Sequence, residues 1–254
     1  MDGFGPRRYR DSMGEKRFAP FIVSEDETDL WVGVDIESCK TISEHRLVSS
    51  IKDEITRCRA LILSYDRKHH GFIQTLTPVV SDPYADPLIS AMITAGIRAD
   101  VGPMGAVAGT IARFAGERII REFSVQEVVV ENGGDIFIQI VQDLDMSIYA
   151  GSSPLSERLG VTIPSGQSPL GVCTSAGTVG PSFSQGSADA VMIACSDTSS
   201  ADAYATAYGN MVQKQEDVDR VISLIRDNSD ILSAVIIKDD KAGICGEFKV
   251  NVQR

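Results

Sequence analysis

Apolar residues recur with a helical period in several stretches of the chain. Between Glu44 and Arg67 they return about every 3.6 residues, which predicts an amphipathic helix. A second helix is expected from Pro87 to Ile97, because proline is accepted in the first turn of a helix. The pattern predicts further helices that start near Met104 and that cover residues 200–212 and 216–227.

Shorter apolar runs predict strands. The runs Phe18–Val23 and Leu30–Val34 flank an acidic turn and predict a hairpin. Further strands are expected at residues 125–130, 136–141, 146–150, 159–163, 171–173, 188–195, 231–237 and 246–252. Because strands and helices do not alternate regularly, the fold class is predicted as α+β, with mixed or antiparallel sheets flanked by helices. A length of 254 residues fits a single domain over 18–254 after a mobile N-terminal segment at 1–17.

Charge limits the classes of partner. The formal net charge is −11, whereas proteins that bind nucleic acid or anionic membranes usually carry a basic surface. We therefore expect no nucleic acid and no membrane partner, although a few backbone amides could still bind a small phosphate-bearing ligand. The first residues contain no apolar signal segment, and the most apolar run, of about twelve residues at 101–112, is too short to cross a bilayer. The expected location is the cytoplasm.

The cysteines indicate no disulfide framework. Their number is odd, they are widely spaced, and none forms a Cys-x-x-Cys pair, so we expect reduced, mostly buried thiols. The three histidines lie at no ligand spacing relative to the cysteines, so a zinc site is not expected.

A glycine turn joins two strand-like runs at residues 131–135. Asn132, Gly133 and Gly134 suit a tight hairpin, because asparagine and glycine accept the positive φ angles of such turns. Alternatively, the backbone here approaches a ligand, and Asp135 holds a ribose hydroxyl, an amide or a loop. The two interpretations are compatible.

A loop rich in hydroxyls and glycine follows the run at 171–173. Thr174, Ser175, Gly177 and Thr178 could present backbone amides to phosphate, with Ser184 further along the same groove. The loop lacks both the Gly-Lys-Ser/Thr ending of a P-loop and the spacing of a Rossmann fingerprint. The other interpretation is a Ser/Gly-rich surface loop.

Asp202 and Thr206 lie four residues apart in the expected helix at 200–212, on the same face. A carboxylate and a hydroxyl at this spacing offer two hard oxygens to Mg²⁺, which takes waters and phosphate oxygens as its other ligands. Ser199 or Ser200 is the expected N-cap, so the pair would sit at a helix start, where phosphate is favoured. The plain alternative is an aspartate at a helix start beside a hydrogen-bonded threonine.

Small residues follow one face of the helix that starts near Met104. A glycine inside a helix costs about 1 kcal/mol relative to alanine. Gly105, Gly109 and Ala112 therefore predict close approach of another backbone or of a ligand or, alternatively, tight packing of the helix on a sheet.

Four ordered motifs resemble the ApbE-like superfamily, named for bacterial flavin transferases. They are VGPMGAVAGTIA at 101–112, VENGGDIFI at 130–138, TSAGTVGPSFSQGSADAV at 174–191 and ADAYATAYGN at 201–210. The resemblance covers most of the chain and is closest to an uncharacterised soluble branch in anaerobic and archaeal lineages. It implies the flavin transferase architecture and, as cofactors, Mg²⁺ and FAD.

The resemblance also assigns roles to residues. In the flavin transferases an Ala-Asp-Ala-x-x-Thr segment holds Mg²⁺ beside FAD, and it matches Asp202 and Thr206 here. Their Gly-Gly-Asp turn matches residues 133–135, and their Thr-Ser-Gly segment matches Thr174, Ser175 and, imperfectly, Ala176. These enzymes move FMN from FAD onto a threonine of a partner protein, with the metal as Lewis acid and template.

The chain departs from the transferases at two places and from the soluble branch at one. They carry a histidine and an Asp-Pro-x-Thr-Gly-like stretch in a longer connection before the Asp/Thr motif, whereas residues 174–206 contain no histidine. Members of the soluble branch commonly have histidine at the position of Pro181, and the Lys-Gly-Tyr-like segment of the transferases is replaced by Ala108-Gly109-Thr110. We therefore expect FMN transfer to be lost while phosphate and metal binding remain.

Three functions follow as hypotheses. The first is Mg²⁺-assisted binding of a flavin or another nucleotide, with transfer or pyrophosphate hydrolysis if the protein is an enzyme. The second is a non-catalytic accessory role in sulfide assimilation and homocysteine formation, an association that comes from the soluble branch. The third is a structural homo-oligomer whose site has decayed. Under the first, the turn at 133–134, the loop at 174–180 and the start of the Asp202 helix should converge on one cleft.

Overall fold

Eight antiparallel strands form the main sheet of the protein. The computed structural model describes residues 17–178 and 186–252. In spatial order the strands are β1 (Phe18–Glu25), β2 (Thr28–Asp35), β3 (Val128–Asn132), β4 (Asp135–Gln139), β7 (Leu170–Ser175), β8 (Ala190–Cys195), β9 (Ile231–Lys238) and β10 (Lys241–Gly246). Every pairing of neighbours in this sheet is antiparallel. Strand β8 is buried along its whole length, as expected for a central strand covered on both faces.

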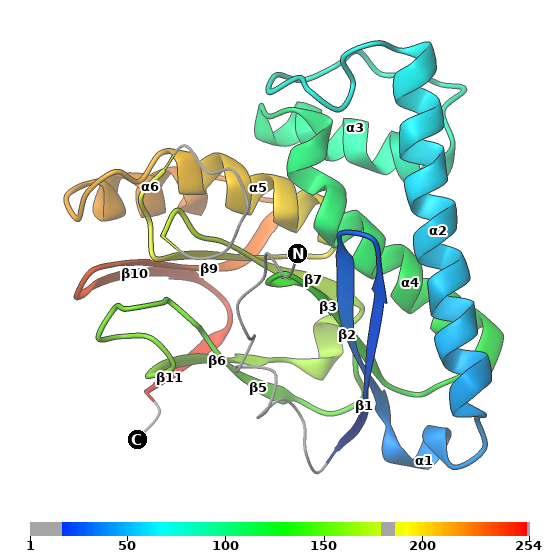
Figure 1. The fold of residues 1–254 in the computed structure, drawn as a ribbon. Helices are drawn as coiled ribbons and strands as arrows, with labels where there is room; N and C mark the ends of the chain where they lie inside the picture. Colours follow the sequence, from blue (N-terminus) through cyan, green and yellow to red (C-terminus); the bar gives the residue numbers. More distant parts are fainter. Residues whose placement is uncertain (1–16, 179–185, 253–254) are drawn as a thin grey trace.

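A second, smaller sheet packs on one face of the main sheet. It has the order β11 (Lys249–Val252), β6 (Leu159–Ile163) and β5 (Leu144–Ser147), again antiparallel. Figure 1 shows it below the main sheet. Apolar residues from both sheets form the core between them, among them Ile138, Val161 and Ile163.

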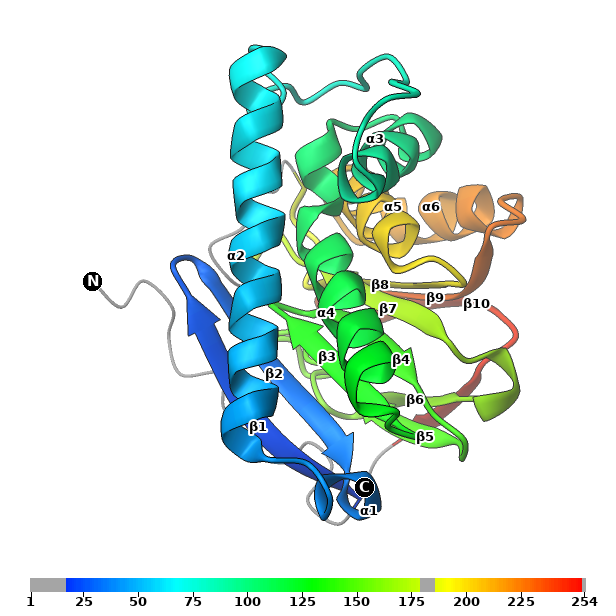
Figure 2. The ribbon, with the colours of Figure 1, turned by 90° about the vertical axis from the view of Figure 1, so that its right-hand side faces the viewer.

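Helices cover the opposite face of the main sheet. The long helices α2 (Glu44–Lys68) and α4 (Val107–Phe123) lie side by side over β1 to β4 (Figure 2), while α5 (Thr198–Asn210) and α6 (Asp217–Arg226) lie over β7 to β10. Helix α3 (Pro87–Ala99) packs against α5, α2 and α4. The short helices are α1 (Ile36–Cys39), η2 (Pro103–Ala106) and η3 (Ser165–Gln167).

The architecture confirms the α+β prediction and selects its antiparallel alternative. The expected hairpin of the first two strands and the long helix from Glu44 are both present, and Pro87 occupies the first turn of α3. Among the described residues, no helix is both long and apolar enough to cross a bilayer.

The single strand expected at 246–252 is wrong. Gly246 adopts a φ of +102°, and a Cβ there would lie 2.3 Å from the carbonyl oxygen of Leu232. The chain therefore bends at this glycine: β10 ends in the main sheet and β11 enters the small one. The short helix α1 was also not expected; it begins where Asp35 accepts a 2.8 Å hydrogen bond from the backbone N–H of Ser38.

Most of the N-terminal segment expected to be mobile, residues 1–16, lies outside the described residues. Its last residue, Arg17, is held by residues that lie before β3 and after β4. The Arg17 guanidinium forms an ion pair with Glu127 at 2.5 Å and donates to the backbone oxygen of Asp143 at 2.7 Å.

Candidate functional site

The turn between β3 and β4 has the backbone conformation that its glycines predict. Gly133 and Gly134 have φ angles of +69° and +106°, and Asn132 pairs with Asp135 across the turn. The Glu131 carboxylate accepts a 2.7 Å hydrogen bond from the backbone N–H of Gly134. The hairpin interpretation is therefore confirmed, and the turn is fixed from within.

Asn132 connects this turn to helix α4. Its side-chain amide donates to the carbonyl oxygen of Ala108 at 3.1 Å. The side chain of Asn132 is thus engaged with the first turn of α4, and it links two of the four motifs.

Asp135 is buried at the start of β4, opposite Cys173 of β7. The next residue of β7, Thr174, also contacts the turn, because its backbone N–H donates to the backbone oxygen of Gly134 at 3.1 Å. Burial, and then the negative charge of Asp202, raise the pKa of Asp135 well above its ordinary value. Two carboxylates from distant parts of the chain therefore share one buried environment.

Asp202 caps a helix to which it does not belong. Its Oδ2 accepts a 2.8 Å hydrogen bond from the backbone N–H of Gly109 in α4. The N-cap residue of α4 is Ala106, whose side chain cannot accept a hydrogen bond. Asp202, which belongs to α5, therefore accepts a hydrogen bond from one of the free backbone N–H groups at the start of α4. Burial raises the pKa of Asp202 to about 7, although the amides of Gly109 and Ala108 oppose the rise.

The N-cap of α5 itself is Asp197, so the prediction of Ser199 or Ser200 is wrong. The Asp197 side chain accepts a 2.7 Å hydrogen bond from the backbone N–H of Ser200. The two serines lie inside the first turn and are buried, and the Ser199 hydroxyl accepts from the hydroxyl of Thr110 in α4 at 2.8 Å. An aspartate before the serines is an equally good cap, which composition alone does not distinguish.

Helices α4 and α5 touch through glycine. A Cβ at Gly109 would lie 2.7 Å from the carbonyl oxygen of Thr198 and 2.8 Å from Cβ of Asp202. A Cβ at Gly105 would lie 3.4 Å from Cγ2 of Thr206. The close approach of another backbone expected at these glycines is therefore confirmed at Gly109, while Gly105 of η2 packs on the Thr206 side chain; the helix-on-sheet alternative is wrong for both positions.

The loop after β7 packs against the far end of α5. A Cβ at Gly209 would lie 3.1 Å from the Ser175 hydroxyl, and one at Gly186 would lie 1.9 Å from the Gly209 oxygen. Gly177 continues this stack, because a Cβ there would lie 2.0 Å from the oxygen of Gly186. The loop backbone can thus lie close to α5 because these three positions carry no side chain.

One predicted binding residue, Thr178, does not join this group in the structure. The Thr178 hydroxyl hydrogen-bonds to Asp189 at 2.9 Å and is engaged there. Ser184 lies outside the described residues, as does Pro181. The contacts join Asn132, Gly134, Asp135 and Thr174 to α4, α5 or each other, so residues of all four motifs meet at one place. That this place binds a ligand stays a prediction.

The donor set near Asp202 suits a hard cation that brings its own ligands. Asp202 offers a carboxylate, and the Thr206 hydroxyl lies 3.4 Å from the Gly105 oxygen, to which it donates. Within residues 17–178 and 186–252, no group of three or more His, Cys, Asp or Glu side chains is placed to hold a metal ion.

Sequence reasoning missed several residues of this region. Glu131 fixes the glycine turn, Cys173 lies opposite Asp135, and the amide of Gly109 binds Asp202. Of these contacts, only the one made by Glu131 could have been suspected from the sequence, because Glu131 lies beside the glycines of the turn. The other two contacts arise from the packing of elements far apart along the chain.

None of the five cysteines has the low pKa of a reactive thiol. Burial raises the pKa of Cys58 to about 12, and it also raises the pKa values of Cys39, Cys173, Cys195 and Cys245. The expected reduced state agrees with the free thiols in the structure. The role in sulfide assimilation stays a prediction, and these thiols do not add to it.

Sequence comparison identifies the family. Residues 10–242 match the family model described as AbpE bacteria. The chain belongs to this family. A relative, the UPF0280 protein of Methanococcus aeolicus, is 34% identical over 211 residues, which cover 82% of this chain and 85% of the relative. The UPF0280 protein of Methanosarcina acetivorans is 37% identical over 201 residues, 79% of each chain.

The fold of this AbpE-family protein is similar to that of solved flavin transferases. The flavin transferase ApbE from Vibrio cholerae superposes with a TM-score of 0.61 at 10% identity, over 89% of this chain and 96% of that one. The ApbE protein from Thermotoga maritima gives a TM-score of 0.58 at 12% identity, with the same coverage. At these identities the likeness establishes the ApbE-like fold, which confirms the expected architecture.

Proposed function

We propose that this protein binds a flavin or another nucleotide with a pyrophosphate group, assisted by Mg²⁺, where β4, β7, α4 and α5 meet. The observation that carries the proposal is the burial of Asp135 and Asp202 in one environment beside the Gly133-Gly134 turn. The similarity in fold to proteins named as flavin transferases supports the flavin as ligand.

The electrostatics support a cation. Burial of two carboxylates is unfavourable when no described residue supplies a positive partner, and the raised pKa values of Asp135 and Asp202 express this cost. A divalent cation would favour the charged form of both groups. Asp202 and Thr206 would hold the cation, which when bound would polarise the phosphate oxygens of the nucleotide.

The residues around the site have separate tasks in this proposal. The Gly133-Gly134 turn brings backbone close to the ligand without side chains, and Thr174 and Ser175 offer hydroxyls along its edge. Asp135 would bind a ligand donor, such as a ribose hydroxyl. Asp202 is fixed by the Gly109 amide, so its carboxylate does not need to be reoriented when the ligand binds.

We further propose that FMN transfer to protein has been lost. The residues between 174 and 206 include no histidine that could act as a base toward an acceptor hydroxyl. General base assistance of this kind typically contributes about 10²–10⁴-fold to a rate. The protein should therefore bind the nucleotide without a useful rate of transfer.

Fluorescence titration of FAD tests the binding proposal. In the presence of Mg²⁺, the wild-type protein should quench FAD fluorescence saturably, and Asp202→Asn should weaken the affinity roughly tenfold, or about 1.4 kcal/mol. Asparagine keeps an acceptor for the Gly109 amide, so the variant should fold. The control is Asp227→Asn, an exposed position at the end of α6. No saturable quenching by the wild type would contradict the proposal.

Mass spectrometry of an acceptor peptide tests the loss of transfer. The protein is incubated with FAD, Mg²⁺ and a threonine-containing acceptor peptide, and the peptide mass is followed. We expect unmodified peptide. A stoichiometric FMN adduct would show that transfer is retained.

A further inference from the structure

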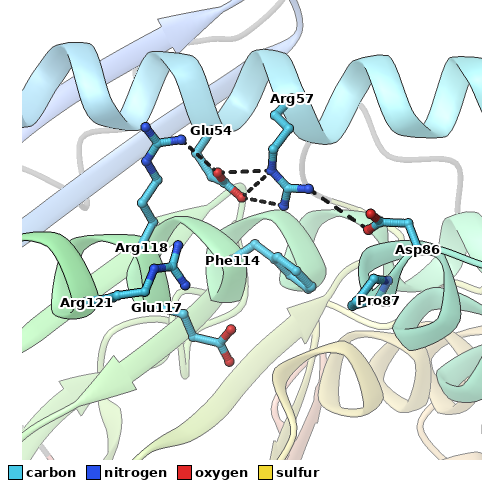
Figure 3. Close-up of a pocket in the computed structure, with 8 residues that line it drawn as sticks. All are labelled: Glu54, Arg57, Asp86, Pro87, Phe114, Glu117, Arg118 and Arg121. Carbon is cyan, nitrogen blue, oxygen red and sulfur yellow. Dashed lines mark hydrogen bonds and ion pairs between the residues drawn. The ribbon is translucent and has the colours of Figure 1, made fainter.

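A cavity lies between α2, α3 and α4, on the side of α4 that faces α2. Its volume is about 340 Å³, within the range of small-molecule sites. Figure 3 shows Glu54 and Arg57 of α2 on one side and Phe114, Arg118 and Arg121 of α4 on the other. The candidate nucleotide site uses the opposite side of α4, where Gly109 contacts α5.

A buried carboxylate positions two of the arginines. Glu54 accepts from Nη2 of Arg57 at 2.6 Å and from Nη1 of Arg118 at 3.0 Å. Burial tends to raise the pKa of Glu54, but the hydrogen bonds from these arginines outweigh it, and the pKa lies below its ordinary value. The carboxylate is therefore charged, and it holds two guanidinium groups at the cavity wall.

The other acidic groups of the cavity are already engaged. Asp86 caps α3 by accepting from the backbone N–H of Leu88 at 3.0 Å, and it lies 4.0 Å from Nη1 of Arg57. Glu117 accepts from Nε of Arg113 at 2.7 Å. Arg118 is also approached by Glu122 at 3.6 Å and Asp53 at 4.0 Å, so its charge is largely compensated.

Arg121 differs from its neighbours. It lines the cavity one turn after Arg118 on α4, and the described part of the chain gives it no hydrogen bond or ion pair. Its five N–H donors remain available, in the planar arrangement that matches two oxygens of a carboxylate or phosphate. Arg121 is therefore an exposed guanidinium at the cavity that forms no ion pair with a described residue.

An apolar wall lies beside these charges. The Phe114 ring and Pro87 line the cavity, and the Arg57 guanidinium lies 5.7 Å from the centre of the ring. A ligand could place an apolar or planar part here while its anionic group reaches Arg121.

We propose that this cavity binds a small organic oxyanion, whose carboxylate or phosphate group is held by Arg121 and whose apolar part contacts Phe114 and Pro87. Arg57 and Arg118, positioned by Glu54, contribute a second set of donors at the wall. The site is separate from the proposed nucleotide site and does not depend on it.

NMR titration of the full-length protein tests the proposal, with the arginine Nε–Hε resonances as readout. The probes are benzoate and inorganic phosphate, added separately, with benzylamine as a cationic control. Benzoate should shift the Arg121 resonance saturably, and phosphate should do so more weakly, because it lacks an apolar part. Benzylamine should leave the resonance in place.

Three variants test whether benzoate binds in this cavity. Arg121→Gln should weaken benzoate binding about tenfold or more, as expected for loss of a charged hydrogen-bond pair. Arg67→Gln removes the same charge from the exposed end of α2 and should change the affinity less than twofold. Phe114→Leu should weaken benzoate binding but not phosphate binding.

The proposal fails if the shifts rise linearly without saturation, or if Arg121→Gln and Arg67→Gln have equal effects. Asp202→Asn separates the two sites. It should leave benzoate binding unchanged, and a loss equal to that in Arg121→Gln would place the anion at the nucleotide site instead.

Discussion

The Asp202 carboxylate of α5 accepts a 2.8 Å hydrogen bond from the backbone N–H of Gly109 in α4. This contact joins the two helices at a point of close approach, where no Cβ separates their backbones at position 109. It also places a carboxylate at the positive end of α4, where the helix dipole favours negative charge. The geometry of the candidate site therefore depends on the packing of α4 against α5.

Replacement of Gly109 by alanine should destabilise the fold. The new Cβ would lie 2.7 Å from the Thr198 oxygen and 2.8 Å from Cβ of Asp202, so the helices would have to separate. We expect a loss of about 1–3 kcal/mol in the free energy of unfolding, despite the higher helix propensity of alanine. Urea denaturation measures it.

The matched control is Gly166→Ala. A Cβ at this exposed position in η3 meets no atom within 4 Å. Its free energy of unfolding should stay within about 0.5 kcal/mol of the wild type. If Gly109→Ala were equally harmless, the two helices would not be in the close contact described.

Stability should depend on pH through Asp202. Its folded-state pKa of about 7 lies above the unfolded value, so the folded state binds more protons between about pH 4 and pH 7. The free energy of unfolding contributed by this group therefore falls as the pH rises through that window, by at most about 1.4 kcal/mol per pH unit. Asp202→Asn should remove this contribution.

The comparison isolates Asp202, together with its effect on the neighbouring Asp135, from the acids that lie elsewhere. The pKa of Glu54 is lowered in the folded state and contributes the opposite slope in both proteins. Subtracting the free energy of unfolding of the variant from that of the wild type at each pH cancels the contribution of Glu54. A difference that is flat from pH 5 to pH 7 would contradict the raised pKa of Asp202.

Much of the fold could be predicted from the sequence, because long amphipathic helices and buried strands have strong periodicity. The helix that begins at Glu44 and the strand at Leu159–Ile163 have the expected starts. The division of residues 246–252 between two sheets could not be predicted, since it depends on a bend at Gly246 that tertiary packing requires.

The candidate site was predictable only in part. The sequence indicated Asp135 and Asp202 because they lie in motifs rich in small residues. Their common burial and the capping of α4 by Asp202 depend on contacts between residues 93 positions apart. The arginine-lined cavity could not be predicted from the sequence. Its residues come from three helices, and in the sequence they resemble those of an ordinary charged surface.

Glu54→Gln should destabilise the packing of α2 on α4. The change removes the buried charge that Arg57 and Arg118 surround. Because both arginines are partly exposed, we expect a loss of about 1–3 kcal/mol, at or below the lower end for buried pairs. Thermal or urea unfolding at pH 7 measures it.

Glu37→Gln serves as the control for Glu54. This residue pairs with Lys40 on the surface, where ion pairs contribute about 0–1 kcal/mol. An equal loss in the two variants would show that Glu54 acts only as an ordinary surface charge.

Metal linkage of nucleotide binding tests the central claim most directly. Calorimetric titration of FAD into the wild-type protein, in Mg²⁺ and again in EDTA, gives the two Kd values whose ratio measures this linkage. We predict a Kd roughly tenfold lower in Mg²⁺ for the wild type, equivalent to about 1.4 kcal/mol, and a ratio near one for Asp202→Asn. Equal Kd values in Mg²⁺ and EDTA for the wild type would contradict the account.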